Sequence, residues 1–429
     1  MPEAPPPQSP ADHLQALCQR SGLKTLHLAG RELLPIVQGG MGIGISAHRL
    51  AGCVAALGAV GTISSVDLRR HHPDLMDRTR DQRVGEAAKA AINAANLEAL
   101  EREIRAAREI SLGRGLVAVN VMRAVSEYAP LVTRSLECGA GAIVVGAGLP
   151  LDLPDLARDF PKTALLPILS DARGVALIVK KWERKGRLPD AIVIEQPRWA
   201  GGHLGAAKVA DLGDTRFDFD QVIPQSLAFL RSAGLEREVP LIAAGGIRRF
   251  EDIARLQALG AAAVQLGTPF VATDECDADE NFKRVLAEAR DEDLVEFTSV
   301  AGLPARAVDT PWLRHYLAAL PRLQETVHKK PRCILAFDCL AQCGLRDGLP
   351  GWGQFCIDTQ LAAGMRGDLK KGLFFRGVGA LPFGHEIVPA RELVERLLTP
   401  GVALGTPRRR RDVVRLVPAQ ATPRDVCLE

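Results

Sequence analysis

The sequence predicts an α/β fold: a (β/α)8 barrel of the TIM type followed by a C-terminal extension. Short apolar runs recur eight times between residues 36 and 266, and helical patterns lie between several of them. Each run is continuously apolar rather than alternating, as expected for parallel strands that are buried on both faces. Eight such runs favour a closed barrel over an open, doubly wound sheet.

The expected elements divide the chain into four parts. The predicted strands are 36–38, 60–63, 116–119, 142–145, 164–168, 191–194, 240–243 and 263–266. Helical patterns cover 83–110, 221–233, 250–259, 281–290 and, as the one clear late helix, 390–398. We therefore expect an N-terminal segment that is partly disordered because of its proline-rich start (1–30), a barrel (31–300), a cysteine-containing extension packed on the barrel (301–400) and a basic tail (401–429).

Composition narrows the class of protein. The chain has 54 basic and 51 acidic residues, and 47% of its residues are hydrophobic, which is ordinary for a globular protein. This balance does not indicate a nucleic-acid or membrane partner. The N-terminus lacks the pattern of a signal peptide, and no apolar run approaches the ~18 residues that cross a bilayer, so we expect a cytoplasmic protein. The tail motif Arg408–Arg411 is interpreted as solvated, because no aromatic residues lie among its arginines.

Glycines gather where the predicted strands end. Gly39, Gly40 and Met41 follow the first strand, Gly245 and Gly246 the seventh, and Gly267 and Thr268 the eighth. The last two pairs suit a phosphate group, because glycine turns at helix starts expose backbone N–H groups where barrels commonly bind phosphate. The chain has no P-loop motif, and the glycines after the first strand lack the spacing of a dinucleotide-binding fingerprint.

Three polar residues follow other strands. Asn120 either contacts a cofactor ring or caps a loop, and Gln196 presents the same choice. His203 comes directly after Gly201 and Gly202. An imidazole can accept a proton near neutral pH, so His203 is the candidate base, although a lone loop histidine more often only forms local hydrogen bonds. The flanking glycines and the barrel context favour the base.

Together these motifs resemble the nitronate monooxygenase family over about residues 33–290. The resemblance is carried by five segments, in order and at family-like spacing: Pro35–Met41, Val119–Asn120, Ala200–His203, Ala243–Ile247 and Gln265–Thr268. This resemblance also extends to flavin-dependent enoyl-ACP reductases and NAD(P)H:quinone reductases, which are related to that family.

The resemblance implies FMN at the barrel mouth and oxidation of alkyl nitronates with O2 to a carbonyl compound and nitrite. His203 matches the histidine that handles the substrate proton. Residues expected around the cofactor are Gly245, Gly246, Gly267 and Thr268 at its phosphate, and Gly39, Gly40, Met41, Asn120, Gln196, Gly201 and Gln265 around its ring and ribityl chain. The segment before Gly201 is about one residue longer than usual, which makes Glu195 the alternative to Gln196 as the ring contact.

Two other functions stay open. The Gly-Gly-Met start of the first loop is typical of the reductase relatives, so an NAD(P)H-dependent reductase of a quinone or enoyl thioester is the alternative enzyme. An RNA-binding or RNA-modifying flavoprotein that uses the arginine tail is the alternative from another class. The expected partners are a small-molecule substrate and, as co-substrate, O2 or NAD(P)H. The sequence leaves the oligomeric state open, and a homodimer is the candidate assembly.

Four cysteines in the extension form a second candidate site. Cys333, Cys339, Cys343 and Cys356 follow the spacing C-x5-C-x3-C-x12-C. Four thiols this close in sequence can hold Zn²⁺ or an iron–sulfur cluster. Their spacing is neither that of a zinc ribbon nor that of a ferredoxin, and buried free cysteines that pack as small hydrophobic residues are the alternative.

Overall fold

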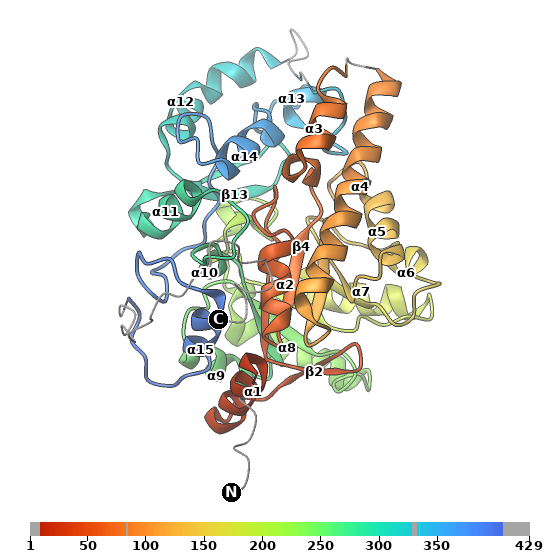
Figure 1. Cartoon of the computed structure of the whole chain (residues 1–429), viewed down its shortest axis with the longest axis vertical. Helices are drawn as coiled ribbons and strands as arrows, with labels where there is room; N and C mark the ends of the chain where they lie inside the picture. The colour runs from red at the N-terminus through yellow and green to blue at the C-terminus, as the bar shows by residue number, and fades with distance from the viewer. Residues whose placement is uncertain (1–8, 83–84, 328–332, 334, 406–429) are drawn as a thin grey trace, which may run out of the picture.

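The computed structural model describes residues 9–82, 85–327, 333 and 335–405, and it confirms the predicted barrel (Figure 1). Eight parallel strands close on themselves in the order β10-β11-β3-β4-β5-β6-β7-β8. They are β3 (Ile36–Gln38), β4 (Val60–Ser64), β5 (Leu116–Met122), β6 (Ala142–Gly146), β7 (Ala164–Leu169), β8 (Ile192–Glu195), β10 (Leu241–Ala244) and β11 (Ala263–Leu266). Each predicted strand corresponds to one of these.

The pairing register brings the strand ends to one rim. Gln38 at the end of β3 lies opposite Leu266 at the end of β11. Ala244 at the end of β10 lies opposite Glu195 at the end of β8. The loops that leave these strands therefore start beside one another, at the end of the barrel that carries active sites in this fold.

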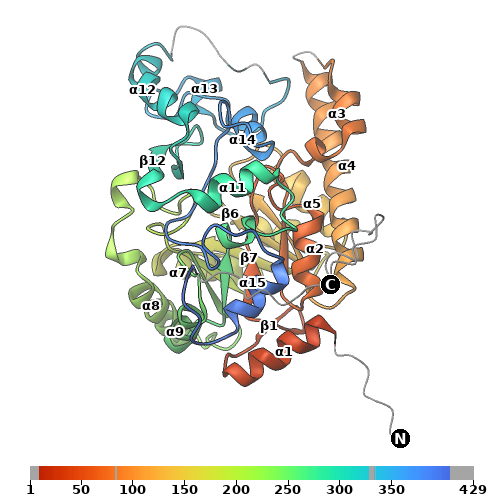
Figure 2. The same ribbon diagram turned by 60° about the vertical axis from the view of Figure 1, so that its left-hand side comes forward.

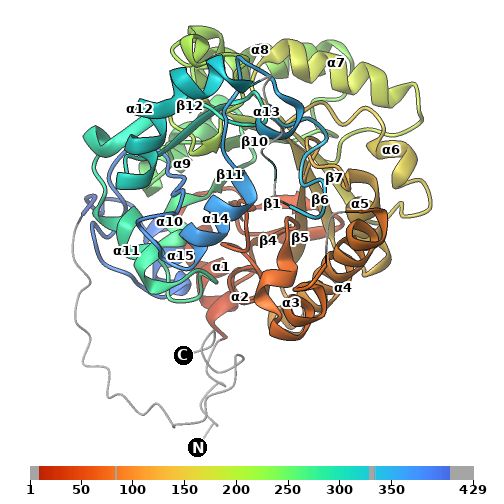
Figure 3. The ribbon, with the colours of Figure 1, turned by 90° about the horizontal axis from the view of Figure 1, so that it is seen from above.

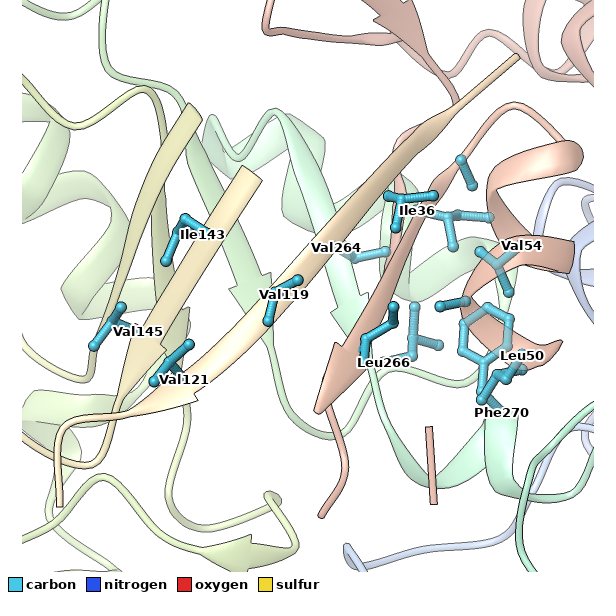
Figure 4. Packing of buried hydrophobic residues seen from close by; sticks show 14 of the residues in the cluster. Ile36, Leu50, Val54, Val119, Val121, Ile143, Val145, Val264, Leu266 and Phe270 are labelled. Carbon is cyan, nitrogen blue, oxygen red and sulfur yellow. The ribbon is translucent and has the colours of Figure 1, made fainter. Parts of the chain in front are cut away.

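Residues alternate between two apolar clusters along each strand. On β5, Val117 and Val119 pack outward with the helices, whereas Leu116 and Ala118 pack in the barrel interior. Figure 4 shows part of the outer cluster, with Val119 on its strand and Leu50 on the facing helix. Burial on both faces is the physical reason that the strands are continuously apolar in sequence.

Helices follow the strands and cover the outside of the barrel. They are α2 (His48–Ala56), α3 (Pro73–Thr79), α4 (Glu86–Ser111), α5 (Tyr128–Glu137), α6 (Leu153–Leu156), α7 (Ala172–Glu183), α8 (Phe219–Ser232), α9 (Phe250–Leu259), α10 (Thr268–Val271) and α11 (Glu280–Glu288), with 3₁₀ turns η1 (Leu68–His71), η2 (Val209–Asp211), η3 (Thr215–Phe217) and η4 (Asp291–Asp293). The helices predicted at 83–110, 221–233, 250–259 and 281–290 correspond to α4, α8, α9 and α11.

The N-terminal segment is ordered from Ser9 onward. A capping box between Ser9 and Asp12 starts α1 (Pro10–Ser21), whose residues Leu14 and Cys18 are buried. A hairpin of β1 (Leu26–Leu28) and β2 (Arg31–Leu33) leads into the barrel. Disorder was predicted for residues 1–10, and Ser9 and Pro10 instead form the start of α1. Positions 1–8 and the arginine motif at 408–411 lie outside the described residues.

The C-terminal extension contains more regular structure than the sequence predicts. From here on the extension is taken from residue 294, because β12 (Leu294–Thr298) pairs with β13 (Pro304–Val308). It also has α12 (Pro311–Glu325), α13 (Gly344–Asp347), α14 (Ile357–Met365) and α15 (Ala390–Leu397). Only α15 was predicted. Pro321 lies within α12 and Gly364 within α14, and both residue types disfavour a helix on local propensity alone. Burial of Ala362, Ala363 and Met365 of α14 supplies the missing stabilisation.

The extension covers the end of the barrel at which the strands terminate. Figures 1 and 2 show α12, α13 and α14 together at the end of the molecule opposite to α1. Viewed from above in Figure 3, α13 and α14 lie over the barrel strands. In the described part of the chain, no helix combines the length and the hydropathy needed to cross a bilayer.

The contact between β4 and α2 gives a stability prediction. A Cβ atom on Gly61 of β4 would overlap the backbone of Ala51 on α2. We expect Gly61→Ala to lower the free energy of unfolding by about 1–3 kcal/mol or more, because the helix must move off the barrel. Urea denaturation would measure the change. Gly213→Ala is the matched control, since a Cβ atom there meets no atom within 4 Å; equal midpoints for the two variants would contradict the prediction.

Candidate active site

A cavity of about 300 Å³ opens at the carboxyl end of the barrel. Its wall combines the loops that follow β3, β5, β8, β10 and β11 with residues of the extension. Eleven of the twelve residues proposed from the sequence line it, namely Gly39, Gly40, Met41, Asn120, Gly201, His203, Gly245, Gly246, Gln265, Gly267 and Thr268. The structure thus brings together in one pocket residues spread over 230 positions of sequence.

A second depression, of about 650 Å³, lies beside α4 and α5. Its arginines are already engaged. Arg105 and Arg134 pair with Glu101 at 2.6 and 3.2 Å, and Arg31 donates to the carbonyls of Gly113 and Gly115. We therefore place the candidate active site at the strand ends.

Two of the glycine loops need glycine for different reasons. A side chain on Gly40 would overlap the Cβ atom of Asn120, so the first loop lies directly against the end of β5. Gly245 and Gly246 have φ values of 105° and 75°, which L-residues with side chains rarely adopt. These loops therefore present bare backbone to the pocket.

Asn120 lies within β5 and is not a loop cap. Its Nδ2 atom donates to the carbonyl of Val144 on β6 at 3.2 Å, and the side chain lines the pocket. Of the two roles that the sequence left open, only the pocket-lining one agrees with this position.

Gln196 does not line the pocket, contrary to the expectation. Its Nε2 atom donates to Asp218 at 3.0 Å, and the side chain is buried outside the cavity. Glu195, the alternative, ends β8 and lines the cavity instead. Side chains alternate along β8, where Ile194 belongs to the outer cluster and Glu195 faces the cavity; Gln196 is the first residue after the strand. Burial raises the pKa of Glu195 to about 7, against the hydrogen bond from the backbone of Gly205.

His203 lies on a short strand that the extension holds in place. This strand, β9 (Gly202–His203), pairs with β13, with His203 opposite Ala305. The Nε2 atom is 2.9 Å from the hydroxyl of Ser299, and the ring centroid is 5.6 Å from that of Phe375. Burial lowers the pKa of His203 to about 4, so the imidazole is neutral at neutral pH.

Arg306 anchors the loop that precedes His203. This buried residue of β13 donates to the carbonyls of Pro197 and Ala200 and forms a 2.5 Å ion pair with Glu296 of β12. The position of the histidine thus depends on residues about a hundred positions later in the chain, and no local pattern around His203 could have indicated them.

Two arginines missed by the sequence reasoning lie at the glycine-rich end. Arg248 follows Gly245 and Gly246, lines the cavity, and has a buried Nε atom with no hydrogen-bond partner among the described residues. Arg376 is buried and donates to the carbonyls of Leu286, Gly377 and Gly379. Burial lowers the pKa of Arg376, and the nearby charge of Arg248 adds to this effect. An arginine two residues after a glycine pair was the signal available for Arg248.

The predicted metal site at the four cysteines is not supported. Cys333, Cys339, Cys343 and Cys356 are free thiols. In the described ranges, no three His, Cys, Asp or Glu side chains are grouped in a way that could hold a metal ion. Burial raises the pKa of Cys339, with further contributions from Asp358 and the other three thiols. Of the four, Cys343 is buried and the other three are half-buried, so the alternative of buried free cysteines holds in full only for Cys343. Cys339 lines the active-site cavity.

Comparison with known proteins agrees with the fold and the pocket. The family model described as nitronate monooxygenase matches residues 29–400. A probable nitronate monooxygenase of Bacillus subtilis (strain 168) is 28% identical over 287 residues, which are 65% of this chain and 77% of that protein.

Two solved structures share the fold. FabK from Thermotoga maritima has a TM-score of 0.58 at 21% identity, over 91% of this chain and 95% of that one. A nitroalkane oxidase from Streptomyces ansochromogenes has a TM-score of 0.56 at 22% identity, over 88% and 96%. Since the family model covers most of the sequence, the chain belongs to the nitronate monooxygenase family and is a flavin-dependent oxidoreductase.

Proposed function

We propose that the protein is an FMN-dependent nitronate monooxygenase that converts alkyl nitronates and O2 to a carbonyl compound and nitrite. The observation that carries this proposal is the pairing, in one cavity, of a neutral, half-buried histidine with an arginine-bearing glycine rim. The first suits a proton acceptor, and the second suits the phosphate of a flavin nucleotide.

The residues present fit FMN. The unpartnered Nε atom of Arg248 needs a hydrogen-bond acceptor, and a phosphate beside Gly245 and Gly246 would supply one. Thr268 and Gly267 would complete the phosphate site, and Asn120, Gln265 and the loop Gly39–Met41 would hold the rest of the cofactor. When bound, FMN supplies the redox chemistry, taking electrons from the substrate and passing them to O2.

His203 would handle the substrate proton. In the tautomer that donates its Nε2–H to Ser299, the Nδ1 atom has a lone pair that can accept the proton alpha to a nitro group. The C–H bond breaks, the N–H bond forms, and the electron pair stays on the substrate as the nitronate. Phe375 against the ring and the pairing of β9 with β13 would restrict the imidazole to one orientation.

An NAD(P)H-dependent reductase is the second candidate, favoured by the sequence Gly39-Gly40-Met41 of the first loop. Anaerobic mixing separates the two. We expect alkyl nitronates to bleach the flavin absorbance near ~450 nm, and NAD(P)H to leave it unchanged on the same timescale. Rapid bleaching by NAD(P)H with none by nitronates would instead support the reductase.

Replacing the base tests the role of His203. We expect His203→Asn to lower kcat/KM for a neutral nitroalkane by roughly 10²–10⁴-fold, because the proton acceptor is lost. Oxidation of a preformed nitronate should fall much less, since that substrate has already lost the proton. His315→Asn, at an exposed position on α12, is the control. Unchanged nitroalkane turnover by His203→Asn with FMN still bound would refute the role.

Replacing the arginine tests the phosphate site. We expect Arg248→Ala to weaken FMN binding by roughly 10–100-fold, the loss of a charge-assisted hydrogen bond. Fluorescence quenching of added FMN would give Kd. The neighbouring Arg249 is exposed and lies near Glu251 and Asp252, so Arg249→Ala is the matched control. Equal Kd values for the two variants would remove Arg248 from the site.

A further inference from the structure

One acidic residue of the barrel rim has no role in the chemistry proposed above. It is Glu195, the last residue of β8, which lines the cavity and is half-buried. Its side chain points to the same side of the strand as Val193, a residue of the barrel interior, whereas Ile194 between them packs with the outer helices. The side chain of Glu195 therefore projects into the mouth of the barrel, where the cavity lies.

The loop that carries the candidate base also holds this carboxyl group. The backbone N–H of Gly205 donates to it, and Gly205 is two residues after His203. A Cβ atom on Gly205 would overlap the Oγ atom of Ser170 and lie 3.3 Å from Oε2 of Glu195, so only glycine brings the backbone this close. One loop thus presents a proton acceptor and holds a carboxyl group, and both side chains line one cavity.

No cation balances the charge of an ionised Glu195. In the described part of the chain, no lysine, arginine or histidine side chain forms an ion pair with it. The guanidinium group of Arg248, which also lines the cavity, lies over the ring of Trp199 instead. A carboxylate without a partner is unfavourable inside a protein, so this position favours the protonated acid. The direction of the pKa of Glu195, raised by burial, agrees.

Proton removal beside a nitro group creates the need for such an acid. In the reaction proposed above, the C–H bond breaks, the proton goes to Nδ1 of His203, and the electron pair moves onto the nitro group. Negative charge therefore develops on the nitro oxygen atoms. A hydrogen-bond donor directed at those atoms stabilises this charge, and a carboxylic acid kept neutral by its surroundings is a donor of this kind.

We propose that Glu195 is a second catalytic residue, whose protonated carboxyl group donates a hydrogen bond to a nitro oxygen atom while His203 removes the alpha proton. Glu195 keeps its own proton throughout, so the proton balance of the reaction is unchanged. The inference rests on the proposed function. It gives the two side chains complementary roles, since His203 must be neutral to accept the proton and Glu195 must be neutral to donate the hydrogen bond.

The two roles predict a bell-shaped pH profile. His203 is neutral above its pKa of about 4, and Glu195 is protonated below its pKa of about 7. We expect kcat/KM for a freshly dissolved, neutral nitroalkane to be highest between these values and to fall as the pH rises through about 7. In Glu195→Gln this fall should disappear, because the amide group donates at every pH in the range.

A variant of Asp358 is the matched control for this profile. The strands beside β8, which are β7 and β10, carry no ionisable side chain. Asp358 borders the cavity, but its carboxyl group is turned toward Arg70 and Asp67, and burial together with the charge of Asp67 raises its pKa. Burial also raises the pKa of the Cys339 thiol on the cavity wall. Asp358→Asn should keep the fall in kcat/KM that Glu195→Gln removes.

Removing the donor measures its contribution to the rate. We expect Glu195→Leu to lower kcat/KM for the nitroalkane by roughly 10²–10³-fold, as for the loss of one donor to a developing oxyanion. Glu195→Gln, which keeps a donor of the same size, should retain most of the activity. FMN content and Tm show whether each variant has folded and bound its cofactor. Wild-type turnover by Glu195→Leu would contradict the assignment.

Anion binding separates this inference from the proposed reaction. Butanoate is an unreactive carboxylate that matches the nitronate of equal chain length in shape and charge, and calorimetric titration onto the oxidised, FMN-loaded enzyme gives its Kd without turnover. Above the pKa of Glu195, we expect binding to the wild type to weaken by up to about tenfold per pH unit, because the ionised carboxylate repels the anion. Binding to Glu195→Gln should not change over the same range.

The outcomes of this titration are distinct. The expected pattern without nitrite formation from nitronates would support Glu195 and sink the monooxygenase reaction. Absence of butanoate binding at any pH, or the same pH dependence in the wild type and in Glu195→Gln, would overturn the inference even if nitronates are oxidised.

Discussion

Closure of the eight-stranded sheet is the constraint on which the rest of the structure depends. The pairing of β11 with β3 joins the last strand of the barrel to the first, and the pairing of β10 with β8 sets the register beside it. A closed sheet buries both faces of every strand, which requires apolar side chains inside the barrel and a layer of helices outside it. Closure also places every strand end on one rim. Residues that are far apart in sequence therefore lie close together there: the glycine loops, Asn120, Glu195 and Arg248.

The extension completes the pocket that the barrel begins. It contributes β13, which holds the strand of His203, and Arg306, which fixes the preceding loop through two carbonyl groups. It also supplies Phe375 against the imidazole and Arg376 near the glycine rim. The barrel thus carries the residues that suit a flavin, whereas the extension orients the base and contributes the wall that a substrate would contact.

Much of the fold could be predicted because the relevant signal is local. Eight apolar runs were recognisable, since two-sided burial imposes the same composition on each strand. The glycine pairs were recognisable because positive φ values and close backbone approach exclude other residues. Helices α12 and α14 were missed, since Pro321 and Gly364 oppose them locally and only tertiary burial stabilises them. The metal site, one of two alternatives for the four cysteines, is not supported among the described residues, because sequence spacing alone does not arrange thiols as ligands.

The sequence by itself determined the barrel, its glycine-lined rim and the placement of His203 after a strand, because each follows from steric rules acting over a few residues. Tertiary structure alone decided which neighbours face the cavity. The pleat of β8 turns Glu195 inward and Gln196 toward Asp218. Folding of the extension brings Ser299 to His203. The contact between Ser299 and His203 joins positions 96 residues apart. It exists because burying the extension on the barrel is favourable, which no local pattern encodes.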